Sequence, residues 1–195
     1  NMYIMHHFPE IISSSFNNKL RDYPWKMNND YLNSWKNGLT GYPIVDSCMK
    51  QLTNLGWMHN RGRMIVASFL TKDLFIDWRE GEKWFMENLV DADTASNVGG
   101  WQWTAGSGVD AAPYFRIFNP ITQGKKFDPD GKFVKYWIKE LSDLPSKIIH
   151  EPWLSEEEIK SPYDSPIVDH SQARAQALLI FNSLKSTELK CLLSL

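Results

Sequence analysis

The residues best suited to chemistry lie at positions 91–103, which read Asp-Ala-Asp-Thr-Ala-Ser-Asn-Val-Gly-Gly-Trp-Gln-Trp. If this segment is helical, Asp93, Asn97 and Trp101 share one face, because they are spaced four residues apart. Trp103 lies about 200° from Trp101 around such a helix, so we expect it to serve a different surface. The pattern predicts a site on a helix, but it equally fits a helix end that carries aromatic core residues.

Two adjacent glycines, Gly99 and Gly100, interrupt this segment. Each glycine costs a helix roughly 1 kcal/mol relative to alanine. Such a cost indicates that something large approaches the backbone at this point.

A second candidate segment, residues 57–64, reads Trp-Met-His-Asn-Arg-Gly-Arg-Met and begins a predicted helix over 60–75. That helix is apolar nearly all round, which is typical of a central, buried helix. Its first turn is nevertheless polar and carries Asn60, Arg61 and Arg63. Free N–H groups at a helix start favour anions, so this turn is either the wall of a binding site or an ordinary solvated helix start.

The elements that must position these residues are all predicted to be helices. A helix that begins at Pro43 and ends at Gly56 has a regular apolar stripe, with Asp46 and Lys50 forming an ion pair on its other side. Further helices are predicted over 1–12, from 84 into the 91–103 segment, from 130 or 131 to 141, over a short stretch opened by the capping box at 155–158, and over 170–186. Residues 13–39 are predicted to be a surface loop pinned by aromatic residues such as Trp25. The fold class is therefore all-α.

Composition limits the possible functions. The chain has 195 residues and a net charge of −2, which predicts one domain without a general affinity for nucleic acid. Lys125, Lys126, Lys132, Lys135 and Lys139 form the one concentrated basic stretch, which is either a solvated face or a phosphate-contacting rim.

Location and metal content also follow from composition. Two cysteines, no signal-peptide pattern and no run of 18 apolar residues predict a cytoplasmic protein without a membrane span. His6 and His7 are adjacent and make a poor metal pair, so we expect no metal. Nine tryptophans indicate either a very aromatic core or work done by the rings.

The ordered motifs of this chain resemble the photolyase/cryptochrome family, and they are closest to the helical FAD-binding domain of its microbial class I members. The motifs are Thr40-Gly41-Tyr42-Pro43-Ile44-Val45-Asp46, Gly56-Trp57-Met58-His59-Asn60-Arg61, Arg63-Met64, Asp77-Trp78-Arg79-Glu80-Gly81, and the stretches 97–103, 110–120 and 150–153.

The resemblance implies a set of flavin contacts. These residues are Trp57, His59, Asn60, Arg63, Asp91, Asp93 and Asn97. Asn97 is implied to lie beside the flavin N5, where its carboxamide can accept the N5–H of the reduced ring. Arg63 and Asp91 are implied to form an ion pair that flanks the isoalloxazine ring.

The resemblance also implies an electron path and a DNA surface. Trp101, Trp78 and Trp25 would pass an electron from the surface to the excited flavin, a role for Trp25 that its spacing did not indicate. The pocket for a flipped pyrimidine dimer is implied to be lined by Asn60, Arg61, Met64 and Trp103, with Arg116 and the lysines on phosphates.

The implied function is light-driven repair of cyclobutane pyrimidine dimers, a carbon–carbon lyase reaction in which excited reduced FAD donates an electron to the dimer. The alternatives are a cryptochrome-type flavin photoreceptor and an inactive fragment of a photolyase. Asn97 and Met64 favour dimer repair, because other family members carry different residues there.

The resemblance implies that 1–195 is part of a larger domain, with a core at 40–153 and C-terminal helices at 154–195. The N-terminal α/β antenna domain, which would hold a folate or deazaflavin, has no counterpart in this sequence. We therefore expect a monomer that alone holds FAD weakly or not at all, and that lacks repair activity unless the upstream part is supplied. Gly62 also stands where the family often has a larger residue.

Overall fold

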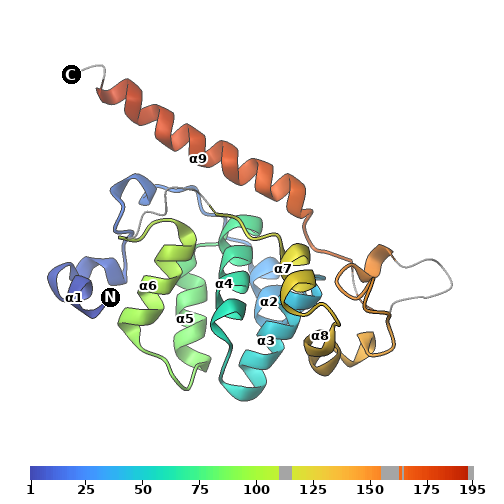
Figure 1. Ribbon diagram of the computed structural model, residues 1–195. Coiled ribbons are helices and arrows are strands. Elements are labelled where there is room, and N and C mark those ends of the chain that lie inside the picture. The colour runs from blue at the N-terminus through green and yellow to red at the C-terminus, as the bar shows by residue number, and fades with distance from the viewer. Residues whose placement is uncertain (110–115, 155–162, 164, 193–195) are drawn as a thin grey trace.

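The computed structural model describes residues 1–109, 116–154, 163 and 165–192. Every regular element in these residues is a helix, which confirms the predicted fold class (Figure 1). The α-helices are α1 (Met2–His7), α2 (Asn29–Asn37), α3 (Pro43–Leu55), α4 (Asn60–Ser68), α5 (Trp78–Asn88), α6 (Thr94–Ala105), α7 (Pro120–Phe127), α8 (Lys132–Trp137) and α9 (His170–Leu192). Short turns of helix are η1 (Pro9–Ile12), η2 (Asn18–Leu20), the π-helix η3 (Phe69–Asp73), η4 (Lys139–Leu141) and η5 (Pro152–Leu154).

Helices α2 to α6 form the body of the molecule, and α9 runs across it and out beyond it (Figure 1). The core is centred on α4, whose residues Ile65 and Val66 are buried as the apolar pattern predicts. The indole of Trp35 on α2 is fully buried and donates a hydrogen bond to the Val66 carbonyl at 3.0 Å. This bond fastens α2 to the central helix.

Helix α3 begins and ends as predicted, with Pro43 at its first position and Gly56 in the left-handed conformation (φ 64°) after its last. The predicted surface pair of Asp46 with Lys50 is wrong. Asp46 is fully buried, and its carboxylate accepts hydrogen bonds from the Thr40 amide and hydroxyl at 2.8 and 2.6 Å and from the Gly41 amide at 3.1 Å. The carboxylate thus closes the turn that precedes the helix.

Two helices were not predicted from the sequence. Helix α2 lies within residues 13–39, and it forms because Asn28 caps its start through the Tyr31 amide while Trp35 packs inward. Helix α7 contains Gly124 in its interior. A Cβ at Gly124 would lie only 2.5 Å from the ring of His150, so close packing explains this glycine.

Other boundaries differ from the sequence reading in smaller ways. The helix predicted over 130–141 breaks between α8 and η4, and α9 continues past residue 186. The capping box at 155–158 lies outside the described residues. None of the described helices is long and apolar enough to cross a bilayer, and no described group of three His, Cys, Asp or Glu side chains is arranged to hold a metal ion.

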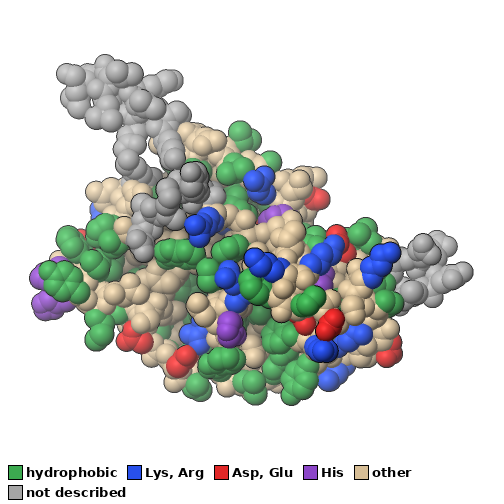
Figure 2. Space-filling view, viewed as in Figure 1, with side chains coloured by type: hydrophobic (Ala, Val, Ile, Leu, Met, Phe, Trp, Pro, Cys, Tyr) green, Lys and Arg blue, Asp and Glu red, His purple; other side chains and the backbone are tan. Residues whose placement is uncertain are grey.

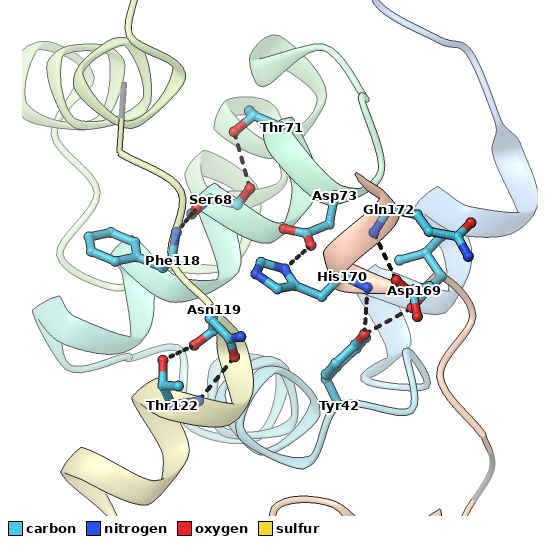
Figure 3. Close-up of polar contacts among 11 residues, drawn as sticks. Tyr42, Ser68, Thr71, Asp73, Phe118, Asn119, Thr122, Asp169, His170 and Gln172 are labelled. Atoms are coloured by element: carbon cyan, nitrogen blue, oxygen red, sulfur yellow. Dashed lines mark hydrogen bonds and ion pairs between the residues drawn. The ribbon is translucent and has the colours of Figure 1, made fainter. Parts of the chain in front are cut away.

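The predicted helix over 60–75 changes to a π-helix at Phe69 and ends before Phe75, which has a left-handed backbone (φ 57°). The wider turn sends two consecutive buried side chains to different helices. The Lys72 amine donates to the Ala105 carbonyl at the end of α6, at 2.5 Å. The Asp73 carboxylate contacts the His170 ring at the start of α9, also at 2.5 Å (Figure 3).

Gly62 is buried where α4 crosses α3. A Cβ at this position would lie 2.9 Å from the Cys48 sulfur and 3.0 Å from Cγ of Met58. The space that a larger side chain would need is therefore filled by these two neighbours.

We expect Lys72 to make stability depend on pH. Burial lowers the pKa of its amine from 10.5 to about 7. Between pH 7.5 and 9.5 the unfolded chain therefore binds more protons than the folded chain, so the free energy of unfolding rises with pH. The limit for one group is about 1.4 kcal/mol per pH unit. Denaturant unfolding of wild type and Lys72→Met across this range should show the rise in wild type and a flatter curve in the variant. Equal slopes in the two proteins would contradict the assignment.

Candidate functional site

One cavity of about 470 Å³ opens between α4, α5 and α6. Its size lies within the range of small-molecule sites. The lining combines apolar walls with a few polar groups, and eight of its residues were singled out from the sequence. Those eight are Asn60, Arg63, Met64, Asp91, Asp93, Asn97, Trp101 and Trp103.

Helix α6 supplies one wall of the cavity. Asp93 caps the helix, with its Oδ1 accepting the Ser96 amide at 2.8 Å. Hydrogen bonds from the side chain and the amide of Ser96 lower the pKa of Asp93. Asn97 and Trp101 follow on the same face, as predicted. The expectation that Trp103 serves a different surface from Trp101 is correct only in part. Trp103 lines this cavity and also a second one of about 360 Å³ on the side of α1. The two tryptophans are therefore only partly separated.

Asn97 is held in one orientation by a residue that the sequence reading missed. Its Nδ2 donates to the backbone oxygen and to Oε1 of Glu82 on α5, each at 2.9 Å. The amide oxygen of Asn97 is thereby left to accept a hydrogen bond. Burial raises the pKa of Glu82, and the bond from Asn97 partly opposes that rise. Glu82 gave no signal in the sequence, because its role depends on α5 and α6 lying side by side.

Arg63 and Asp91 form the ion pair that the resemblance implied. Nη2 of Arg63 contacts both carboxylate oxygens, at 2.9 and 2.8 Å. Its Nε also donates to the Met58 carbonyl at 2.8 Å, which fixes the guanidinium plane. Both side chains are partly exposed at the cavity, so the pair offers matched polar groups without net charge.

The glycines of the site have two different explanations. A Cβ at Gly99 would fall 2.5 Å from the Asn1 side chain, so the backbone is approached there by another part of the chain. A Cβ at Gly100 would meet nothing within 4 Å, although Gly100 lines both cavities. Gly100 therefore leaves a bare stretch of helix backbone facing open space.

The three tryptophans of the implied electron path lie in or against the main core. The Trp101 ring rests on the backbone of α5 at Gly81, where a Cβ would be 2.1 Å from the ring. Trp78 begins α5 and is fully buried. Trp25 is partly buried, with its ring 4.2 Å from that of Tyr23. The N–H groups of Trp25, Trp78 and Trp101 are buried without a hydrogen-bond partner among the described residues.

Besides Trp25 and Trp78, four residues that the resemblance implied as flavin or DNA contacts lie outside the cavity lining. Trp57 and His59 are exposed just before α4, where the His59 ring nitrogen accepts the Arg61 amide at 3.1 Å. Arg61 lies over the rings of Phe118 and Phe127, and Arg116 is exposed in the segment that precedes α7.

Comparison with known proteins gives this arrangement a family. Residues 1–183 match the family described as the FAD binding domain of DNA photolyase. The chain belongs to the DNA photolyase family. The deoxyribodipyrimidine photo-lyase of Escherichia coli strain K12 is 55% identical over 163 residues, which are 83% of this chain and 34% of that relative.

Solved structures of the photolyase/cryptochrome family have the same fold. A bacterial class III photolyase from Agrobacterium tumefaciens superposes with a TM-score of 0.89 and 48% identity, over 94% of this chain and 40% of the other. The Synechocystis cryptochrome superposes with a TM-score of 0.79 and 38% identity, over 90% and 39%. The chain thus spans between a third and a half of the length of the relatives it matches.

The cavity suits the cofactor of this photolyase family domain. A planar, polar ring system needs a flat approach to the backbone, which Gly100 leaves open, and fixed polar groups at its edge. Asn97 and the Arg63–Asp91 pair supply those groups, and each is held by a second contact.

Substitution of the two glycines should separate folding from FAD binding. Gly100→Leu has open space and adds a better helix former, so the fold should hold and the helix should gain up to about 1 kcal/mol. The leucine would occupy the cavity, and we expect FAD affinity to fall at least tenfold. Titration of FAD against the chain by fluorescence measures this change.

The matched control is Gly99→Ala, which lies one residue away and does not line the main cavity. It should need only a shift of the Asn1 side chain and leave FAD affinity unchanged. Equal affinities for wild type and Gly100→Leu would show that the flavin does not lie against this backbone.

Proposed function

We propose that this chain is the part of a photolyase that places FAD against a flipped cyclobutane pyrimidine dimer in DNA and supports light-driven repair. The observation that carries the proposal is that eight of the residues to which the family resemblance gives a role in flavin contact, electron transfer or dimer binding line one cavity. They come from α4, from the α5–α6 connection and from α6, so their meeting is a result of the fold.

Reduced FAD, when bound and excited by light, supplies the electron that opens the cyclobutane ring. The residues of this chain would position the flavin ring and polarise it. Asn97 presents its amide oxygen toward the cavity because Glu82 holds the amide nitrogen, so it would accept a hydrogen bond from the flavin N5. Arg63 and Asp91 would flank the ring as a neutral pair, while Asp93 both lines the cavity and caps α6.

Trp101, Trp78 and Trp25 would carry electrons inward from the surface. Trp101 lines the cavity, Trp78 lies in the core on the helix that Trp101 touches, and Trp25 lies partly exposed against that core. Oxidised indole keeps its proton unless an acceptor is near. The N–H groups of these rings have no hydrogen-bond partner in the described part of the chain, which favours reversible electron transfer.

The substrate side of the proposal rests on Asn60, Met64 and Trp103. All three line the same cavity as the proposed flavin contacts. Trp103 offers a stacking face to a flipped base, and such stacking is worth roughly 1–3 kcal/mol. Arg61, Arg116 and the lysines of α7 and α8 would contact phosphates. The protein would act as a monomer on damaged DNA.

A photoreceptor without repair activity is the second candidate, because the Synechocystis cryptochrome has the same fold. Met64 and Asn97, which the family resemblance associates with dimer repair, both line the cavity and favour repair. The division into a core at 40–153 and a C-terminal part at 154–195 stays a proposal. The buried residues Ile11, Leu32 and Trp35, which precede residue 40, pack in the same hydrophobic cluster as residues of the proposed core.

The repair proposal can be tested in a hybrid protein. Residues 1–183 would replace the matching part of the Escherichia coli relative, which supplies the rest of a photolyase. We expect the FAD-loaded hybrid to remove thymine dimers from an oligonucleotide in blue light and not in the dark. Trp103→Ala should weaken binding to the dimer by about 1–3 kcal/mol, and Trp103→Phe should weaken it less. A folded, FAD-loaded hybrid without light-dependent dimer loss would overturn repair and leave the photoreceptor function.

A further inference from the structure

Arg61 is held between aromatic rings. Its guanidinium carbon lies 4.6 Å from the ring centre of Phe127 and 6.0 Å from that of Phe118. Within the described part of the chain it has no carboxylate partner, whereas Arg63 is paired with Asp91 and Arg79 with Asp77. The rings of Phe118 and Phe127 therefore orient the Arg61 side chain, and none of the described carboxylates is paired with it.

The backbone that carries the two rings is held at both ends of α7. The Phe118 amide donates to the Ser68 hydroxyl on α4 at 3.1 Å, and the Asn119 side chain caps α7 through the Thr122 amide, also at 3.1 Å (Figure 3). Phe127 is the last residue of α7. Asp128 follows it, and its carboxylate accepts two amides of the next helix at 3.0 Å each.

Phe127 is exposed in a way that the core does not require. Its side chain is 46% exposed, and its ring also has the Lys126 amine at 5.5 Å. One exposed ring thus gathers two cations. Figure 2 shows Lys and Arg side chains grouped around α7 on this face of the molecule.

A guanidinium that lies against a ring keeps the N–H groups at its edge free. Those groups match the two oxygens of a phosphate, and a ring that limits the side chain's rotamers lowers the loss of freedom on binding. Arg61 follows Asn60, which lines the cavity, so its backbone lies one residue from the cavity lining while its side chain extends toward Phe118 and Phe127.

We propose that Phe127 positions the Arg61 guanidinium for contact with a DNA phosphate beside the cavity, which makes the end of α7 part of the DNA surface. This inference rests on the proposed function, because it takes DNA as the partner. A purely structural role for Phe127 would affect folding and leave the charge of the interface unchanged.

The test is the binding of a fluorescent single-stranded oligonucleotide to the 195-residue chain between 50 and 300 mM NaCl. In Arg61→Gln we expect the slope of log affinity against log salt to fall by about 0.7, the value for one lost phosphate contact. Phe127→Leu, which keeps an apolar side chain of similar size, should weaken binding about threefold and shift the slope toward that of Arg61→Gln. Phe127→Trp, which keeps an aromatic ring at this position, should have the same affinity and the same salt slope as wild type.

The double variant separates positioning from an independent contact. If Phe127 acts through Arg61, Phe127→Leu adds nothing in the Arg61→Gln background. An additive loss, or wild-type binding by Phe127→Leu, overturns the inference while DNA binding stands. A wild-type chain that does not bind the oligonucleotide overturns the DNA proposal and this inference together. Thermal unfolding followed by circular dichroism confirms that each variant is folded.

Discussion

The burial of two ionisable side chains of opposite type on consecutive residues, Lys72 and Asp73, constrains how the helices can be arranged. A buried charge is tolerated only where polar groups meet it. The π-helix turns these neighbours apart, so that Lys72 meets the carbonyl end of α6 and Asp73 meets the first residue of α9. Each charge has the sign that its helix end favours. The Lys72 contact thus holds helix α6 at its C-terminal end, opposite the end that Asp93 caps.

The sequence predicted the elements with a strong local pattern and missed those that depend on tertiary contacts. Helix α3 was located closely because proline and glycine mark its ends. Helix α2 was read as loop because it is polar and Asn-rich, and its burial rests largely on Leu32 and Trp35. The π turn was not predictable, since an apolar run cannot distinguish 3.6 from 4.4 residues per turn. Asp46 looked like a surface residue because four-residue spacing does not reveal which face is inside.

The candidate site was predictable to the extent that its residues share one helix face. Asp93, Asn97 and Trp101 do so, and spacing alone placed them together. The Asn97–Glu82 contact joins two helices, which no periodicity reports. The Trp101, Trp78 and Trp25 series could not be derived from spacing either, because it crosses three separate segments. For those residues the family resemblance carried information that local patterns lack.

The packing around Gly62 has a consequence for how this sequence can change over time. The Cys48 sulfur and the Met58 side chain occupy the volume that a side chain at position 62 would take. A larger residue at position 62 requires the side chain of Cys48 or Met58 to move aside or to be replaced by a smaller one. Substitutions at positions 48, 58 and 62 are therefore coupled, and the effect of a change at one of them depends on the residues at the other two.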